Sequence, residues 1–390
     1  MDTAKFTSQK TGKLVEIQVP ERDWAFIPNP LPSQWVFPER LWLLLVKAKE
    51  TLGRLDGIGR TLPNPELLLK PLEKREALHS SSLEGTYASP KDLLLFEIDP
   101  QEPKSEKDPA NAWLEVSNHS RALRQGMRRL EELPFCLRFI RELHETLLTG
   151  VRGRDRTPGR FRTCQVHIGS DKRYIPPPPN YLQPCLDAFE KELNQPNAKC
   201  DSLVRCYLLH YQFEAIHPFL DGNGRIGRVL MSLLIYKWCN LSMPWLYMSA
   251  FFERYKDEYI DNLFRISSEG DWDTWIEFCL TGTIEQAEKS IRRCDAFRVL
   301  KDRFMQEAGQ TSVRAHVIIE DLFTTPVVTI PALRNRHSVS YPTAKADVTG
   351  LLEKGVLQEI PDTRPKAYFS PAIVEIAYSD PMGSAERESA

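Results

Sequence analysis

The stretch HPFLDGNGRIGR, residues 217–228, places a histidine, an acid, three glycines, an asparagine and two arginines within twelve residues. It contains Gly222-x-Gly224-x-x-Gly227, the glycine spacing of a dinucleotide-binding fingerprint. That fingerprint needs an apolar strand before its first glycine and an acidic residue about 20 residues later. The residues before the stretch have helical periodicity instead, and MPWLYMS, residues 243–249, contains no acid. The context therefore excludes an NAD site in a Rossmann fold.

The glycines still fit an anion site of another kind. Gly222 and Gly224 lead into a helix expected over residues 226–238, so their backbone N–H groups lie at the positive end of its dipole. Arg225 and Arg228 are three residues apart and therefore lie near the same anion. The pattern indicates a cradle for phosphate groups.

Two further side chains give this cradle a chemistry. Asp221 would repel a phosphate, but its carboxylate suits a Mg²⁺ ion that bridges phosphate oxygens. His217 ends the preceding helix, where a neutral imidazole can accept the proton of an attacking hydroxyl. Together these residues predict phosphoryl or nucleotidyl transfer.

The composition is that of an ordinary globular protein. The chain has 390 residues, of which 42% are hydrophobic and 27% charged, with a net charge of −2, so we expect two or three domains and no general affinity for nucleic acid or membranes. The longest apolar run, residues 229–236, is too short to span a bilayer, and no secretory signal is recognised. Eight scattered cysteines without a CxxC pair predict reduced thiols, a cytoplasmic location and no zinc site.

Helical periodicity dominates and divides the chain into four regions, so we expect a mainly α fold. The regions are a proline-rich N-terminal region (1–110), a helical core (111–295), a C-terminal domain (310–380) and a tail (381–390). Within the core, residues 162–176 alternate around a Gly-Ser-Asp turn and end in a proline run, which predicts a β-hairpin. Asp201 and Ser202 predict the start of the helix that ends near His217.

The C-terminal region has the pattern of a winged helix-turn-helix, an α+β domain. The expected elements are helices at 313–323, 331–336 and 342–354 and strands at 356–360 and 368–376. Residues 331–380 contain six basic and six acidic residues, whereas a DNA-binding surface usually has a basic surplus. Arg334, Arg336 and Lys345 are candidate phosphate contacts, and target recruitment and a structural role stay open beside DNA binding.

The stretch 217–228 resembles the complete Fic signature, HPFx(D/E)GNGRxxR, at every specified position, and the resemblance extends over roughly residues 60–290. Fic proteins are mostly adenylyltransferases, which move AMP from ATP to a Ser, Thr or Tyr hydroxyl of a target protein. The resemblance implies that His217 is the general base and Asp221 the Mg²⁺ ligand. Phe219 would anchor the loop in the core. The implied ATP-binding residues within the motif are Gly222, Asn223, Gly224, Arg225, Ile226, Gly227 and Arg228.

A second segment, SSSLEG, residues 80–85, resembles the inhibitory pattern (S/T)xxxE(G/N) of the same family. Ser80 and Glu84 are one helical turn apart, and Gly85 is a natural helix C-cap, so Glu84 is expected in the last turn. The helix dipole disfavours an acid there, and a cationic partner would compensate. The resemblance implies that this partner is Arg228, which would then be withheld from the γ-phosphate of ATP.

Other positions follow from the resemblance with less support from the residues themselves. Tyr255, Tyr259 and Asn262 are candidate adenine contacts, although aromatic residues at helical spacing also pack in cores. Trp272 and Trp275 are expected in the core. The hairpin would be the flap on which the target docks as an added strand, through Val166, Ile168 and Lys172.

These patterns favour a protein adenylyltransferase that uses ATP and Mg²⁺, modifies target proteins and itself, and is inhibited by its own Glu84. The alternatives are a Fic-fold de-adenylylase or other phosphotransferase, and a nucleotide-sensing regulator that binds DNA. A homodimer is expected from relatives only.

Overall fold

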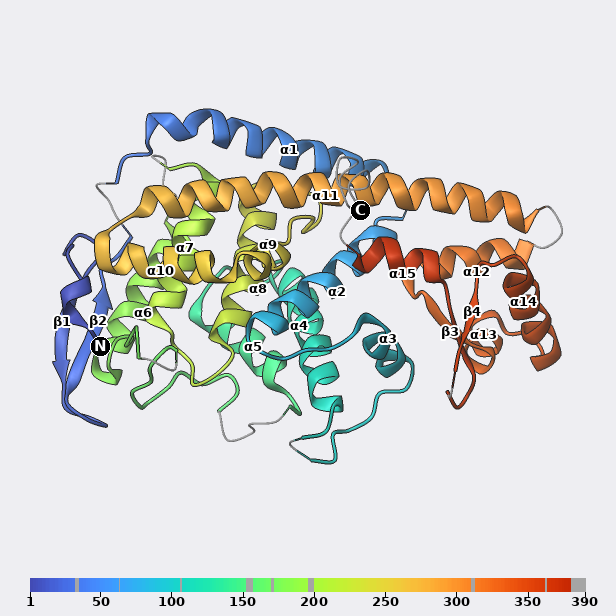
Figure 1. Ribbon diagram of the computed structural model, residues 1–390, viewed down its shortest axis with the longest axis horizontal. Helices are drawn as coiled ribbons and strands as arrows, with labels where there is room; N and C mark the ends of the chain where they lie inside the picture. Colours follow the sequence, from blue (N-terminus) through green and yellow to red (C-terminus); the bar gives the residue numbers. More distant parts are fainter. Residues whose placement is uncertain are drawn as a thin grey trace.

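The structure is a computed structural model that describes residues 1–31, 35–62, 64–105, 107–151, 157–169, 172–195, 200–309, 313–361 and 363–379. Helices form most of it, and short strands lie at the two ends of the elongated molecule (Figure 1). The expectation of a mainly α fold is therefore confirmed. The elements not introduced below are η1 Thr3–Lys5, η2 Glu39–Leu41, α5 Leu137–Leu148 and α6 Pro179–Asn194.

Two buried helices position the signature stretch between them. Helix α7, Ser202–Ile216, starts where the sequence predicted, because the Asp201 carboxylate accepts a hydrogen bond from the Leu203 amide at 2.9 Å. Helix α8, Asn223–Trp238, is buried along nearly its whole length and packs against α7. Since both helices are buried, the loop that joins them has a fixed position in the core.

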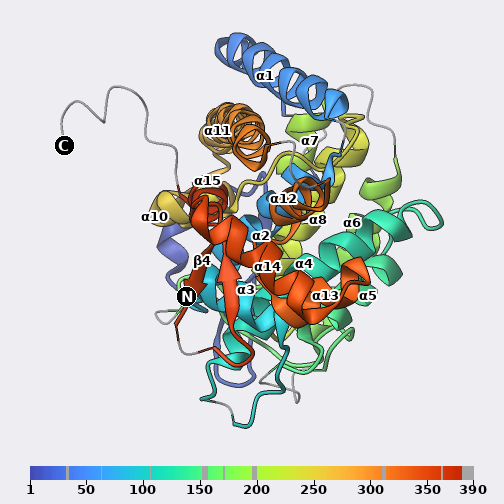
Figure 2. The same cartoon turned by 90° about the vertical axis from the view of Figure 1, so that its right-hand side faces the viewer.

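A long pair of helices covers this core. Helix α1, Trp42–Thr61, lies alongside α11, Trp272–Ala308, in both views (Figures 1 and 2). Trp272 and Trp275 are buried in α11, as expected. Helical periodicity in the sequence predicts a helix from residue 271 to about 293, but α11 continues to Ala308 and connects the core with the C-terminal region. The same periodicity predicts one helix over residues 251–267, but the structure has two, α9 Ser249–Arg254 and α10 Lys256–Glu269, with a break at Tyr255.

The N-terminal region contains a hairpin that the sequence did not indicate. Strand β1, Gly12–Ile17, pairs antiparallel with β2, Asp23–Pro28. The Phe26 amide of β2 donates to the Ile175 carbonyl at 2.8 Å, so this hairpin lies against the segment predicted as the flap. That segment has one antiparallel bridge, between Ile168 and Tyr174, and its predicted turn residues 170–171 lie outside the described residues.

Helix α2, Glu66–Leu83, carries the SSSLEG segment through the middle of the molecule. It packs against α4 (Ala110–Arg129), α8 and α9 on the core side, and against α12 and α15 of the C-terminal region (Figure 1). Within it, Leu68, Leu69 and residues 71–77 are buried. The helix ends at Leu83, so Glu84 is the C-cap residue and not part of the last turn, and Gly85 follows with φ +83°.

The C-terminal region contains helices and a three-stranded antiparallel sheet of strand order β3-β5-β4. Its elements are α12 Val313–Thr324, β3 Val327–Thr329, α13 Ile330–His337, α14 Tyr341–Glu353, β4 Gln358–Ile360, β5 Ala367–Phe369 and α15 Pro371–Tyr378. The predicted strand 368–376 is wrong beyond Phe369, because Pro371 begins a helix in which Ile373 and Ala377 are buried one turn apart. The winged helix-turn-helix assignment stays a prediction.

This region is joined to the core by apolar contacts. Leu94 of α3, Pro90–Ile98, clusters with Val327, Ile360 and Ala367 of the small sheet. Since α12 and α15 also pack on α2, the C-terminal region and the helix that carries Glu84 share one packed interior.

Candidate functional site

A cavity of about 630 Å³ opens where α2, α7, α8, α10 and the flap segment meet. Its lining includes Glu84, Ile168, His217, Gly224, Arg228 and Tyr259. Six residues from distant parts of the sequence that were singled out as candidates therefore face one space. The volume is within the range of small-molecule sites in proteins.

His217 lines this cavity and has an unusual backbone conformation. It caps the C-terminus of α7 with φ +49° and ψ 63°, and its amide donates to the Phe213 carbonyl at 3.0 Å. Burial and the nearby Arg162 charge lower its pKa to about 4. The imidazole is therefore neutral at physiological pH, which a general base requires.

Arg162 holds the chain around His217 in place. Its guanidinium donates to the carbonyls of His217 at 2.8 Å, Cys164 at 3.1 Å and Pro177 at 2.6 Å. Its backbone amide donates to the Pro218 carbonyl at 2.9 Å. Burial lowers the pKa of Arg162 to about 10, so it remains a cation that binds carbonyl dipoles.

The rest of the loop is fixed by side chains that do not face the cavity. The Asn223 amide exchanges two hydrogen bonds with the backbone of Phe219, at 2.8 and 2.9 Å. The buried Phe219 ring stacks on His144 with 3.7 Å between ring centroids. His144 accepts from the Gly159 amide through Nδ1, so Nε2 carries the proton and donates to the Asp221 carbonyl at 2.9 Å. These contacts fix the backbone from which Asp221 and the glycines project.

The Glu84 carboxylate fills the space that a side chain at Gly224 would need. A Cβ at Gly224 would lie 2.1 Å from Oε1 of Glu84, well inside van der Waals contact. Gly224 is in the first turn of α8, where backbone N–H groups and the helix dipole attract negative charge. The Glu84 carboxylate therefore lies against the anion cradle that the sequence predicted.

Arg228 is held by the same inhibitory segment. Its guanidinium donates to Oε1 of Glu84 at 2.7 Å, and to the hydroxyl and the carbonyl of Ser80, both at 2.8 Å. Desolvation alone would raise the pKa of Glu84, but the Arg228 charge outweighs it and the pKa is lowered. The Arg228 side chain is 2% exposed and that of Glu84 is 39% exposed, so only the acid can leave the pair toward solvent.

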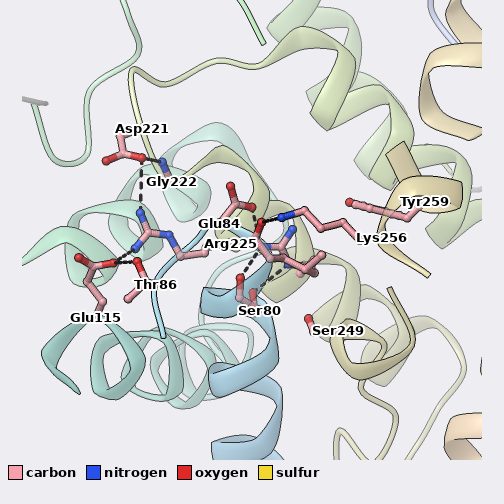
Figure 3. Close-up of polar contacts among 12 residues, drawn as sticks. Ser80, Glu84, Thr86, Glu115, Asp221, Gly222, Arg225, Ser249, Lys256 and Tyr259 are labelled. Carbon is pink, nitrogen blue, oxygen red and sulfur yellow. Dashed lines mark hydrogen bonds and ion pairs between the residues drawn. The ribbon is translucent and has the colours of Figure 1, made fainter. Parts of the chain in front are cut away.

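Arg225 lies on the other side of the loop and, among the described residues, is not in the lining of the cavity. Its guanidinium donates to Oε2 of Glu115 at 3.0 Å and lies 3.5 Å from Oδ1 of Asp221 (Figure 3). The Thr86 hydroxyl donates to the same Glu115 oxygen at 2.8 Å. Arg225 is thus surrounded by carboxylates, in contrast to the phosphate-binding position that the resemblance implies.

The remaining predicted ATP-binding residues are mostly buried, and only some of them reach the cavity. Asn223, Ile226 and Gly227 are buried in α8, where a Cβ at Gly227 would lie 2.2 Å from Oε1 of Glu214. Of the three candidate adenine contacts, Tyr259 lines the cavity. Asn262 is buried and Tyr255 is 39% exposed, and neither is among the described residues that line the cavity.

The flap residues are divided between two hollows. Ile168 lines the main cavity, while Val166 and Lys172 line a shallow depression against the β1–β2 turn. Lys172 forms an ion pair with Glu21 of that turn. The N-terminal hairpin therefore closes one side of the flap.

Sequence reasoning missed five residues of the site: Glu115, His144, Arg162, Glu214 and Lys256. Glu214 is a buried carboxyl beside Arg228, and burial raises its pKa to about 8. Lys256 donates to the Leu83 carbonyl at 2.8 Å, at the end of α2. A signal existed for Glu115, because Asn111, Glu115, Asn118 and His119 are polar at helical spacing and all are buried.

The residues present fit a Mg²⁺ ion only if a nucleotide shares its coordination. Within the described part of the chain, no group of three or more His, Cys, Asp or Glu side chains could hold a metal ion. Asp221 is a single carboxylate next to the anion cradle, and Mg²⁺ commonly binds one or two carboxylates together with substrate phosphates and water. Asp221 is therefore the candidate ligand.

Comparison with known sequences identifies two matching regions. Residues 42–128 match the Fic/DOC family N-terminal profile, and residues 134–235 match the Fic/DOC family profile. Curated proteins named protein adenylyltransferase Fic are similar over 109 residues, at 36% identity in Drosophila grimshawi and 35% in Drosophila melanogaster. The matched part is 28% of this chain and 22% and 21% of those relatives, so the chain spans about a fifth of their length.

Solved structures share the fold. A Fic family protein from Desulfovibrio desulfuricans superposes with a TM-score of 0.56 at 19% identity, covering 88% of this chain and 98% of that one. Fic-1 from C. elegans superposes with a TM-score of 0.52 at 21% identity, covering 65% of this chain and 73% of that one. At such identities the likeness concerns the fold alone. With the complete signature at 217–228 and the two profile matches, residues 42–235 contain a Fic/DOC N-terminal domain and a Fic/DOC domain.

Proposed function

We propose that this protein is an adenylyltransferase that transfers AMP from ATP to hydroxyl groups of proteins, itself included, and that Glu84 inhibits it. One observation carries the proposal: a neutral histidine and an anion-binding helix N-terminus face the same cavity, and an internal carboxylate lies on the anion site. The names of the curated relatives support the same reaction class.

In the transfer step, the target hydroxyl gives its proton to the imidazole of His217 while its oxygen attacks the α-phosphorus of ATP. The bond from that phosphorus to the oxygen bridging to the β-phosphate breaks, and pyrophosphate leaves with the electron pair. Arg162 keeps His217 in place, and the first turn of α8 provides backbone N–H groups for the phosphate oxygens. Mg²⁺ bound at Asp221 would neutralise phosphate charge.

Inhibition follows from the position of Glu84. Its carboxylate lies on Gly224 and on Arg228, so a triphosphate cannot use both groups while Glu84 stays there. The cavity itself remains open, so ATP can enter in an unproductive position. Binding of the phosphates and binding of Glu84 then compete for one guanidinium.

The expected location is the cytoplasm. All eight cysteines are unpaired thiols, which suits a reducing compartment that also contains ATP. Within the described residues, no helix has both the length and the apolarity needed to cross a membrane. Homodimerisation and DNA binding by the C-terminal region stay predictions.

The test uses the Glu84→Gly variant of the full chain, incubated with Mg²⁺ and ATP labelled in either the α- or the γ-phosphate. We expect label on protein from the α-position only, and none when His217→Ala is added. Label transferred from the γ-position would indicate a kinase and contradict the proposal. Release of label from a premodified chain by wild-type protein would instead identify a de-adenylylase.

A further inference from the structure

Glu115 of α4 lies outside the two short motifs, residues 80–85 and 217–228, yet it contacts the segments that carry both. Its Oε2 accepts hydrogen bonds from the Thr86 hydroxyl at 2.8 Å and from Arg225 at 3.0 Å. Arg225 in turn lies 3.5 Å from Oδ1 of Asp221, which accepts from the Gly222 amide at 2.7 Å. Figure 3 shows Thr86, Glu115, Arg225 and Asp221 in this order along one side of the loop.

We propose that Glu115 is a positioning residue: through Arg225 it orients the Asp221 carboxylate for the Mg²⁺-bound nucleotide, and through Thr86 it links that carboxylate to the loop after Glu84. This inference rests on the proposed function and adds to it a residue from another helix. It also gives Arg225 a role within the protein, beside the phosphate contact that the resemblance implies.

Charge and burial support the role of Glu115. The side chains of Glu115 and Arg225 are each 5% exposed, whereas that of Asp221 is 35% exposed. A buried guanidinium needs a carboxylate, and Glu115 provides one that solvent hardly reaches. Without it, the guanidinium would turn fully to Asp221 and neutralise the charge that attracts the metal ion.

The link to the inhibitory segment is equally direct. Thr86 is two residues after Glu84, is buried, and donates to the same Glu115 oxygen that receives Arg225. A shift of the backbone after Glu84 therefore changes the hydrogen bonding of Glu115, and with it the position of Arg225. The metal-binding and inhibitory parts of the site are in this way connected by a single carboxylate.

The main test compares Glu84→Gly with Glu84→Gly/Glu115→Gln in the full chain. Binding of α,β-methylene-ATP is measured by calorimetry, once with Mg²⁺ and once with EDTA. We expect Glu115→Gln to weaken binding about tenfold or more with Mg²⁺, and less than twofold in EDTA. Equal binding with Mg²⁺ would overturn the inference, and equal weakening in both conditions would show a merely structural effect and overturn it as well.

The matched control is Glu73→Gln. Glu73 accepts from Arg124 at 2.6 Å, so this pair joins the same helices, α2 and α4, away from the cavity. We expect unchanged binding with Mg²⁺ and with EDTA. If Glu73→Gln weakened Mg²⁺-dependent binding as Glu115→Gln does, the effect would belong to the helix pair and not to the site.

A second pair of variants keeps the inference testable if Glu115→Gln does not fold. Thr86→Val removes the hydroxyl and Thr86→Ser retains it. We expect Thr86→Val to weaken Mg²⁺-dependent binding about threefold and Thr86→Ser to bind like the parent. The inference fails if both bind alike. If the parent Glu84→Gly does not bind the analogue even with Mg²⁺, the proposed function fails too.

Discussion

The end and the middle of helix α2 are held in different ways, although both are in the centre of the molecule. In the middle, Glu73 pairs with Arg124 of α4, Lys74 with Glu97 of α3, and the Glu76 carboxylate accepts from the Ser249 amide at 3.0 Å. At the end, Glu84 keeps 39% of its side-chain surface exposed, and in the part of the chain that the structure describes its carboxylate forms one ion pair, with Arg228. The middle fixes the helix, and the end can detach from its partner.

This difference has a consequence for activation. Moving the whole helix would break buried polar contacts to three helices and the packing against α12 and α15. Moving Glu84 requires only side-chain rotation beyond the last residue of the helix. We therefore expect activation to occur by displacement of the Glu84 carboxylate, while α2 stays in place.

The largest expected effect comes from removing the acid at the end of the helix. If the Glu84–Arg228 pair is worth about 1.4–3 kcal/mol, Glu84→Gly should raise self-modification roughly ten- to a hundredfold. The rate is measured as incorporation of α-labelled ATP into the purified chain. Equal rates for variant and wild type would contradict the proposed inhibition.

A change in the middle of the helix should have the opposite signature. Glu73→Ala removes the acceptor of a hydrogen bond from a charged group and should lower the free energy of unfolding by about 1.5–3 kcal/mol. Self-modification should stay at the wild-type level, because Glu84 and Arg228 are unaffected. Urea unfolding and the labelling assay measure the two quantities on one preparation. Strong activation of Glu73→Ala would mean that movement of the whole helix releases the inhibition.

Of the contacts along α2, those at its end could be predicted from the sequence. Glu84 and Arg228 belong to short motifs, so their pairing was expected before the fold was known. The middle could not be predicted, because Glu73, Lys74 and Glu76 are ordinary helix residues whose partners lie far away in the sequence. Only the three-dimensional structure shows that they are buried.

Other features of the site and fold could not be predicted for the same reason, because they depend on partners that lie far away in the sequence. Arg162 and His144 hold the loop through backbone carbonyls and an aromatic ring, and no local pattern marks a single arginine or histidine for such a role. The break between α9 and α10 and the extension of α11 to Ala308 depend on packing partners and not on propensity. Residues of a catalytic loop are readable from a motif, whereas the residues that support it are scattered.

A smaller effect is expected at Lys256, which also acts on the end of α2. Its ammonium donates to the Leu83 carbonyl, where a cation is favoured by the helix dipole. Lys256→Met should destabilise the last turn and raise self-modification about two- to fivefold. The double variant with Glu84→Gly should show no further increase, since the acid is already gone. An additive increase would mean that Lys256 acts on the nucleotide and not on the helix.

The smallest expected effect concerns pH and tests whether the end of α2 also tunes the histidine. Burial and Arg162 lower the pKa of His217 to about 4, while the nearby Glu84 carboxylate acts in the opposite direction. A general base works when deprotonated, so the rate is lost only as the pH falls through this pKa, and removing Glu84 lowers that pKa further. In Glu84→Gly, the rate should change less than twofold between pH 7 and 5.5. An ordinary pKa of 6.5 would instead give a fall of about eightfold. The measurements are kept at or below pH 7 because the pKa of Glu214 is about 8. At higher pH this carboxyl becomes charged beside Arg228 and would change the site in a second way.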